Sequence, residues 1–294
     1  MKNFNIPNGV KSLDGYSFCN CSNLTSINIP ESVTYIGIGA FYLCTNLKSI
    51  AIPDSVTKIE NITFTGCSSL TSISIPESVT YIGLDAFKDC TSLTSIYIPD
   101  SVTLTGLSGT FSGCTSLTNV KLPDVIYIIS TNTFAGCSSL LNIIIPDSVT
   151  SIKECAFEGC KSLTNIAIPE SVTKIKTWAF KDCTSLKSIA INNPDCEISN
   201  AKDTIPETAV IYGYKNSTAQ TYAESFNRKF ISLEEIGDIS GNGEIDLYDA
   251  IEIAKAIMGL RTFTAEEMII ADFNMDGAVD LYDAIEIART LLPK

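Results

Sequence analysis

Oxygen-bearing side chains recur at a fixed spacing in two segments of the sequence, "DISGNGEIDLYD" at 238–249 and "DFNMDGAVDLYD" at 272–283. Ca²⁺ takes about six to eight oxygen ligands, and alternate side chains of a tight loop can converge on one ion. Gly243 and Gly277 permit the sharp bend that such a loop needs. The pattern therefore predicts two calcium loops. The predicted ligands are Asp238, Ser240, Asn242, Glu244, Asp246 and Asp249 in the first loop, and Asp272, Asn274, Asp276, Ala278, Asp280 and Asp283 in the second, with backbone carbonyls contributed by Glu244 and Ala278.

The alternative for each loop is an acidic surface turn without a metal, but oxygen ligands occur at every expected position in both. The loops also depart from EF-hands, which need a helix before the loop and usually have Glu at position twelve. Here position twelve is Asp249 or Asp283, and "KFISLEEIG" before the first loop is short and strand-like. "TAEE" at Thr264–Glu267 is a capping box, which predicts a helix between the two units.

This arrangement resembles the type I dockerin domain of cellulosomes, which consists of two tandem loop–helix units, each shaped like half an EF-hand. Residues 237–294 cover the whole length of that family. The resemblance implies a small all-α domain that binds two Ca²⁺ ions. It also implies a partner, the cohesin domain of a scaffoldin protein.

The nonapeptide "DLYDAIEIA" occurs at 246–254 and again at 280–288, where each predicted helix begins. Ala250, Ile253 and Ile257 should be buried on one face of the first helix. The opposite faces carry Leu247, Tyr248, Ile251 and Lys255 in the first copy, and Leu281, Tyr282, Ile285 and Arg289 in the second. Dockerins bind cohesin through these positions, and identical copies permit two orientations related by a half turn. Alternatively, these residues pack against the solenoid, although an exposed apolar patch is typical of a partner surface.

Composition excludes several classes of function. The net charge is −13, without the Lys and Arg clusters that bind a phosphate backbone, which argues against nucleic acid. The chain has no histidine, which removes the commonest general base and the usual zinc ligands. No apolar run approaches the length of about 18 residues that spans a bilayer, so we expect no membrane insertion. We therefore expect that the protein is not an enzyme. The alternative is an enzyme with a catalytic site among the cysteines.

A period of 23 residues runs from Ile6 to Ala190, and "IPESVTYIGIGAFYLCTNLKSIA" from Ile29 is its clearest copy. One step, from Ile98 to Leu122, has 24 residues, with the slack around Leu104–Phe111. A period of this length predicts a leucine-rich-repeat solenoid of eight coils, each with a short parallel strand. In "SLTSISIP", for example, the Leu and Ile residues should point inward and Ser72 and Ser74 outward.

The repeats resemble the BspA-type leucine-rich repeats, whose signature is "IPxxVxxIGxxAFxxC". The segment Ala209–Leu233 resembles that family's C-terminal cap, with a helix over Ser217–Phe226. The resemblance predicts a mixed α/β chain with a solenoid domain at 1–234 (repeats 6–190, cap about 191–234), followed by a dockerin at 237–294. We expect an apolar coil edge near Ile6 and further repeats before it in the natural protein. The sequence begins "MKNFNIPNGVKSLDG", which holds no secretory signal.

Eight of the eleven cysteines follow the repeat. They are Cys21, Cys44, Cys67, Cys90, Cys114, Cys137, Cys160 and Cys183, whereas Cys19, Cys155 and Cys196 are out of register. A chain of disulfides or metal sites is one interpretation. Because equivalent residues of stacked coils sit on parallel backbones, and a disulfide needs specific dihedral angles, we favour a ladder of buried free thiols.

The outward strand positions are mostly small and polar, and Tyr97, Lys121 and Ile144 interrupt this pattern in three successive coils. These three residues are a possible ligand patch on the concave face. Alternatively, they reflect neutral sequence variation on a surface that binds its ligand elsewhere. Together the resemblances imply a secreted, non-catalytic cellulosome component for polysaccharide degradation, whose repeats act as a recognition or spacer module with an unknown ligand. The alternative is a cell-surface adhesin in which calcium only stiffens the C-terminal domain.

Overall fold

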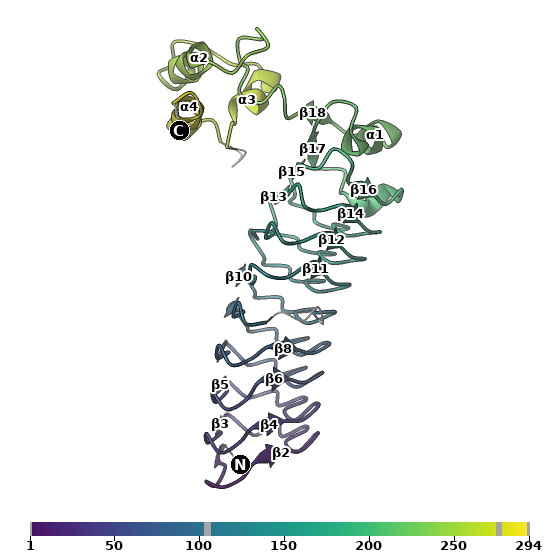
Figure 1. The fold of residues 1–294 in the computed structure, drawn as a ribbon, viewed down its shortest axis with the longest axis vertical. Coiled ribbons are helices and arrows are strands. Elements are labelled where there is room, and N and C mark those ends of the chain that lie inside the picture. The colour runs from purple at the N-terminus through teal and green to yellow at the C-terminus, as the bar shows by residue number, and fades with distance from the viewer. Residues whose placement is uncertain (1, 103–106, 275–277, 293–294) are drawn as a thin grey trace.

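The computed structural model describes residues 2–102, 107–274 and 278–292. A solenoid of short parallel strands is followed by three helices beyond its C-terminal end (Figure 1). The predicted fold class is confirmed. The solenoid has about ten turns rather than eight, because strands of the cap continue the stack.

The longer strands of successive coils stack in parallel on one side of the solenoid, here named the long-strand face. They are β1 (Asn3–Asn5), β3 (Ser26–Asn28), β5 (Ser49–Ala51), β7 (Ser72–Ser74), β9 (Ser95–Tyr97), β10 (Asn119–Lys121), β13 (Asn165–Ile168), β15 (Ser188–Ile191), β17 (Val210–Gly213) and β18 (Phe230–Ser232). Ser49 pairs with Ser72, so one sequence period is one coil. Residues 142–145 form no strand at the equivalent place.

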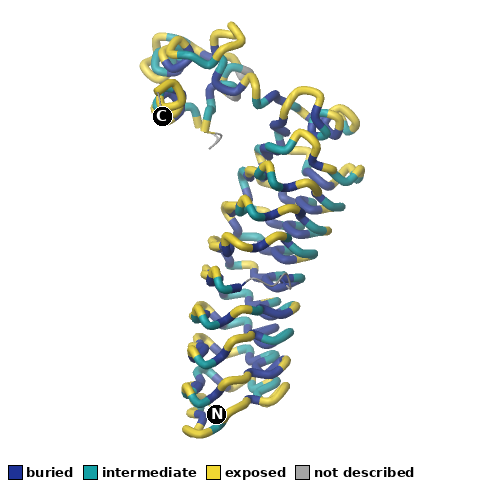
Figure 2. Tube along the Cα trace, in the orientation of Figure 1, coloured by how far each residue is buried: buried dark blue, intermediate teal, exposed yellow. Residues whose placement is uncertain are grey.

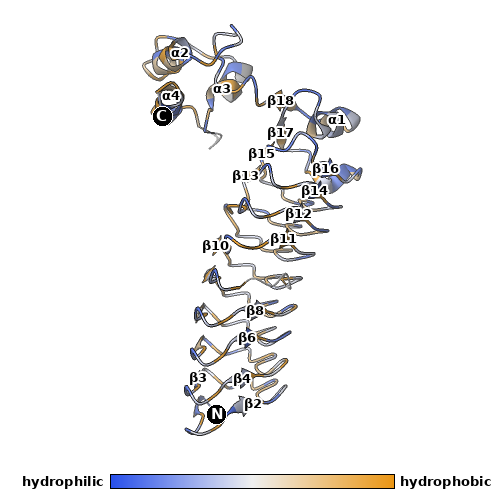
Figure 3. Ribbon diagram, viewed as in Figure 1, coloured by the Kyte–Doolittle hydropathy of each residue, from blue (hydrophilic) through white to orange (hydrophobic). Residues whose placement is uncertain are grey.

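A second column of two-residue strands lines another side of the stack. It comprises β2 (Ser12–Leu13), β4 (Tyr35–Ile36), β6 (Lys58–Ile59), β8 (Tyr81–Ile82), β11 (Ile128–Ile129), β12 (Ser151–Ile152), β14 (Lys174–Ile175) and β16 (Glu197–Ile198). The same set of buried positions recurs in each coil between the two columns, with exposed turns outside (Figure 2). Hydrophobic and hydrophilic segments alternate along every coil in the same order (Figure 3), which is why the period was readable in the sequence.

A ladder of phenylalanine rings fills the centre of the solenoid. Its members are Phe18, Phe41, Phe64, Phe87, Phe111, Phe134, Phe157 and Phe180. Neighbouring centroids lie between 5.3 Å and 5.7 Å apart, and the larger value joins Phe87 to Phe111 across the 24-residue step. The extra residue therefore leaves the core spacing intact. Within the predicted slack, residues 104–106 lie outside the described residues, whereas Leu107 is buried.

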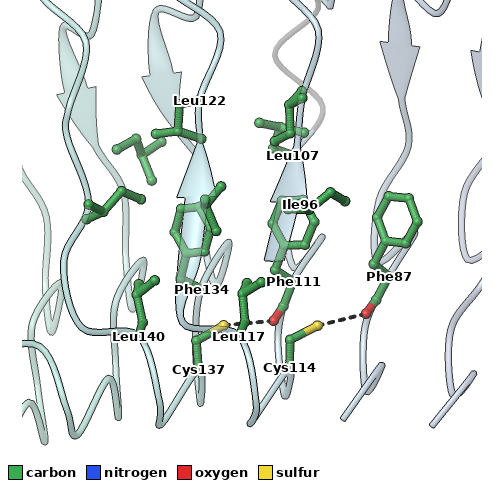
Figure 4. Close-up of a cluster of buried hydrophobic side chains, with 14 of the residues drawn as sticks. Phe87, Ile96, Leu107, Phe111, Cys114, Leu117, Leu122, Phe134, Cys137 and Leu140 are labelled. Atoms are coloured by element: carbon green, nitrogen blue, oxygen red, sulfur yellow. Dashed lines mark hydrogen bonds between the residues drawn. The ribbon is translucent and has the colours of Figure 1, made fainter. Parts of the chain in front are cut away.

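The cysteine ladder runs beside the rings. Seven of its eight members are fully buried, and each S–H donates to the backbone carbonyl of a phenylalanine one coil back, as Cys114 does to Phe87 at 3.1 Å (Figure 4). The predicted ladder of buried thiols is thereby confirmed. In the first coil Cys21 and Phe18 are only half-buried, whereas Ile6, near which an exposed apolar edge was expected, is buried.

Burial of these thiols predicts a loss of stability in alkaline solution. Burial raises the pKa of Cys44 and Cys114 from 9.0 to about 12. The folded chain therefore holds these protons more tightly than the unfolded chain, and the resulting stability is complete below pH 9 and lost as the pH rises towards 12. We expect the free energy of unfolding to fall by about 1.4 kcal/mol per pH unit for each such thiol.

Urea unfolding at a series of pH values from 8 to 11 measures this slope. The double variant Cys44→Ala/Cys114→Ala is the control, because it lacks two of the titrating groups and should show a shallower slope at the same pH values. An unchanged slope in that variant would show that other groups govern alkaline unfolding.

The cap is held on the last coil by a helix and a buried tyrosine. The helix α1 (Thr218–Ser225) begins after Ser217, whose side chain accepts a hydrogen bond from the backbone N–H of Gln220. The hydroxyl of Tyr222 accepts from the N–H of Ile205, beyond the 3₁₀ turn η1 (Lys202–Thr204). The helix predicted for the cap is confirmed.

Three helices form the C-terminal module, namely α2 (Leu247–Ile257), α3 (Ala265–Ala271) and α4 (Leu281–Thr290). Thr264 and Glu267 form the predicted capping box of α3. The helices enclose a small core of Ile239, Ala250, Ile253, Phe263, Ala271, Ala284 and Ile287. Among the residues that the structure describes, none of the helices has the length and apolar character that a bilayer span requires.

Candidate functional site

The first predicted calcium loop winds around Asp238. The carboxylate of Asp238 accepts hydrogen bonds from the backbone N–H groups of Asn242 (3.1 Å) and Gly243 (2.8 Å), and from the hydroxyl of Ser240 (3.2 Å). The side-chain oxygen of Asn242 accepts the N–H of Glu244 at 2.8 Å. The bend at Gly243, with φ +88°, lets these oxygens face the inside of the loop.

Asp249, at position twelve, ties the beginning of this loop to its end. Its two carboxylate oxygens accept the backbone N–H groups of Ser240 (2.9 Å) and Asp246 (2.8 Å). Asp246 is the N-cap of α2 and in turn accepts the N–H of Tyr248 at 2.7 Å. The residue that closes the loop therefore also belongs to the capping box of the helix, so the loop and the helix form one local unit.

The second loop repeats this geometry where it is described. The carboxylate of Asp283 accepts the N–H groups of Asn274 (3.1 Å) and Asp280 (2.8 Å), and Asp280 caps α4 by accepting the N–H of Tyr282 at 2.7 Å. The predicted ligand Asp276 lies outside the described residues.

The donor set of the first loop fits a calcium ion. Asp249 is fully buried, and within the described ranges no lysine or arginine forms an ion pair with it. A buried carboxylate without a cationic partner is costly, whereas a Ca²⁺ ion held by oxygen ligands would neutralise it. Among the described residues, no three acidic, histidine or thiol side chains are clustered so that they could hold a metal ion.

The duplicated helices present an apolar surface to solvent. The exposed fractions are 59% for Leu247 and 70% for Tyr248 on α2, and 57% for Leu281 and 67% for Tyr282 on α4. Of the other predicted partner-binding residues, Ile251 and Arg289 are exposed, and Lys255 and Ile285 are half-buried. We name these eight residues the duplicated face. Its four Leu and Tyr side chains are therefore not packed against the rest of the chain.

One prediction for the buried side of α2 was wrong. Ala250 and Ile253 are buried against α4, but Ile257 is 45% exposed. Ile257 is the last residue of α2, where the chain turns away at Met258 and Gly259. Leu291, at the equivalent place after α4, is exposed as well.

The possible ligand patch lies on the long-strand face. The ammonium group of Lys121 lies 5.6 Å from the centre of the Tyr97 ring and 3.2 Å from the carboxylate of Asp100. Ile144 is 86% exposed, and a cleft of about 450 Å³ lies between it and Lys121. The structure thus brings the three residues to one side of the solenoid.

Cys155 and Cys196 lack the lowered pKa of a nucleophilic thiol. A reactive cysteine needs a lowered pKa, usually from a neighbouring cation or a helix N-terminus. Burial instead raises the pKa of Cys196 to about 12, and burial together with the neighbouring Glu158 raises the pKa of Cys155 to about 11.

An apolar seam between the solenoid and the helical module was not predicted from the sequence. Phe273, the second residue of the second loop, packs against Ala190, Tyr212, Ile231 and Ile236. Burial and the charge of Asp272 raise the pKa of Tyr212 to about 12. One feature of the sequence pointed to this contact, because Phe273 occupies the position in the second loop that Ile239 occupies in the first.

Comparison with known families agrees with this division of the chain. The BspA type leucine rich repeat region (6 copies) matches residues 1–108 and 107–202, and the dockerin type I domain matches residues 236–292. Both are non-catalytic modules, and no enzymatic domain is found. A search of curated proteins finds no match.

Solved structures resemble the solenoid. A leucine-rich repeat protein from Bacteroides ovatus is 30% identical, with a TM-score of 0.63 over 79% of this chain and 71% of that one. A leucine rich cell surface protein from Faecalibacterium prausnitzii is 26% identical, with a TM-score of 0.53 over 79% of this chain and 87% of that one. The chain therefore belongs to the BspA-type leucine-rich repeat family and carries a type I dockerin domain at its C-terminal end.

Proposed function

We propose that this chain is a non-catalytic cellulosome component whose dockerin binds a scaffoldin's cohesin in a calcium-dependent way. The observation that carries the proposal is the duplicated face, in which two identical Leu–Tyr pairs are exposed at the starts of α2 and α4. An exposed aliphatic and aromatic patch on an acidic module is typical of a protein partner surface. The solenoid domain would extend over residues 1–234 and the dockerin over 237–294.

Two Ca²⁺ ions would hold the duplicated face in place. The twelfth residue of each loop belongs to the capping box of the following helix, so an ion in the loop supports the first turn, where the Leu–Tyr pair lies. The two copies have the same capping geometry and nearly equal exposure, which supports binding in either of two orientations.

Calorimetric titration of the full chain into a panel of cohesin domains tests this function. We expect tight 1:1 binding to at least one cohesin in Ca²⁺. We expect this binding to be lost in chelator, because loops without calcium would no longer hold the first turns of α2 and α4 in place. Calcium binding by the folded chain without affinity for any cohesin would contradict the proposal.

The alternative function is a cell-surface adhesin, and the ligand patch is the observation that favours it. Tyr97, Lys121 and Ile144 lie together beside a cleft on the long-strand face, and the similar Faecalibacterium prausnitzii protein is described as a cell surface protein. Both functions place the chain outside the cell or on its surface. In the adhesin, binding would depend on these three residues and not on the duplicated face.

A further inference from the structure

One coil of the solenoid breaks the small, polar pattern of the long-strand face. It carries Leu141, which is 53% exposed, and Ile144, which at 86% has the highest exposure among the large hydrophobic residues described. The equivalent residues of the next coil are Thr164 and Ala167. Two aliphatic side chains kept in water on an otherwise polar face are typical of a surface that a partner covers.

The cleft of about 450 Å³ on this face opens beside Ile144. Its apolar lining includes Leu122, Ile143 and Pro146. Residues 142–145 form no strand, and within the described part of the chain none of their backbone groups hydrogen-bonds to a neighbouring coil. The cleft therefore combines an apolar lining with backbone N–H and C=O groups that the sheet does not use. An extended polypeptide can bond to such groups.

A column of exposed carboxylates runs past the cleft, one in each coil and each directly after the coil's proline. One member, Asp100, forms an ion pair with Lys121 at 3.2 Å, which neutralises the cation nearest the cleft. The other members form no ion pair with a lysine or arginine of the described residues, and they are Glu31, Asp54, Glu77, Asp124, Asp147 and Glu170. This excess of negative charge favours a basic partner and steers its approach.

The same residues disfavour a neutral carbohydrate, which binds proteins largely by stacking its rings on exposed aromatic faces. None of the described residues that line the cleft is aromatic. The nearby ring of Tyr97 has the ammonium group of Lys121 over it at 5.6 Å, and its hydroxyl donates to Glu77 at 3.4 Å. A carbohydrate would also leave the column of carboxylates without a counter-charge.

We propose that this cleft binds a polypeptide segment in which an aliphatic side chain is flanked by lysine or arginine residues. The aliphatic side chain covers Leu141 and Ile144, the basic groups pair with Asp124 and Asp147, and the segment's backbone bonds to residues 142–145. The proposal names the partner of the ligand patch and rests on the recognition role proposed for that patch. It does not depend on cohesin binding.

Fluorescence anisotropy of a labelled synthetic peptide that alternates leucine and lysine measures binding to the full chain in Ca²⁺. We expect Ile144→Ser to weaken this binding about tenfold, because an aliphatic contact in the cleft is lost. The matched control is Leu84→Ser, which removes a side chain that is 46% exposed on another coil and should leave the affinity unchanged. Circular dichroism verifies that each variant is folded.

The charged part of the site is tested with the same peptide. Asp124→Asn combined with Asp147→Asn should weaken binding about fivefold and reduce its dependence on salt. The control combines Glu31→Gln with Asp54→Asn, which removes two charges from the far end of the same column and should leave the affinity unchanged. Equal losses in the cleft variants and their controls would overturn the proposal, because the acidic chain would then attract the peptide without a site. Absence of binding by this peptide would overturn it as well.

Two further probes test the class of partner. A peptide that alternates leucine and glutamate and a soluble β-1,4-glucan oligosaccharide should not bind. Glucan binding that is lost in Ile144→Ser would show that the cleft takes carbohydrate instead. Cohesin titration of the same variants reports separately on the proposed function, since the duplicated face is unchanged. Failure of the leucine–lysine peptide with normal cohesin binding would therefore overturn this inference alone.

Discussion

Replacing Leu247, Tyr248, Leu281 and Tyr282 together by alanine will abolish cohesin binding, with a loss of at least about 1,000-fold in affinity, or roughly 4 kcal/mol. These side chains are the largest exposed apolar groups of the duplicated face, and buried aromatic anchors dominate the energy of protein interfaces. Replacing only one pair should change the dissociation constant by a factor of about two, because the other helix still offers a complete surface in the second orientation.

Calorimetry with the cohesin that binds the unmodified chain measures both effects. Met258→Ala and Leu260→Ala are matched controls, since both residues are exposed and apolar but lie outside the duplicated face, at 64% and 72% exposure. The number of bound Ca²⁺ ions verifies that each variant is folded. If the loss of one pair alone removes binding, the idea of two orientations fails, and if the fourfold variant binds normally, the duplicated face is not the cohesin surface.

The substitution Phe134→Ala will destabilise the solenoid by about 3–5 kcal/mol. The Phe134 ring is fully buried, and it stacks on Phe111 at 5.6 Å and on Phe157 at 5.4 Å. Its removal leaves a cavity in the middle of the ladder and ends two ring contacts. Because each coil of a solenoid contacts only its neighbours, the loss weakens the coupling between the two halves of the stack.

Urea unfolding followed by tryptophan fluorescence measures this change. The single tryptophan, Trp178, lies in the solenoid and therefore does not report on the dockerin. Ile144→Ala is the control, because that side chain is 86% exposed and its loss should change stability by less than about 0.5 kcal/mol. A cost below about 1 kcal/mol for Phe134→Ala would mean that the ladder is not the main source of cohesion between coils.

Much of the fold was predictable because its interactions repeat at short range. Each period repeats the same inward-facing residues, namely Leu, Ile, Val, Phe and Cys. Stacking places each of them on the equivalent residue of the neighbouring coil. The local winding of the first predicted calcium loop follows from spacing for a similar reason, since Asp238 and Asp249 bond to backbone groups within the same twelve residues. Such contacts are fixed by spacing alone.

Features that depend on contacts between distant segments were not predictable. Ile257 fits the buried side of α2 by helical periodicity, but it is the last residue of that helix and is 45% exposed. The missing strand at 142–145 has an ordinary repeat sequence, "LLNIIIP", and only its neighbours decide whether it pairs. The seam at Phe273 joins a loop of the dockerin to strands about 40 to 85 residues earlier in the chain, a relation that no local pattern contains.

The sequence by itself determined the repeat, its inward residues, the two acidic loops and the duplicated nonapeptide, because each is set by spacing along one segment. The tertiary structure alone decided which apolar residues of the helices remain in water and which loop touches the solenoid. The two loops have nearly the same ligand pattern, but only one lies where the last strands of the stack can pack against it. Burial is a property of the assembled surfaces, and the free energy of removing apolar groups from water depends on partners that the local sequence does not specify.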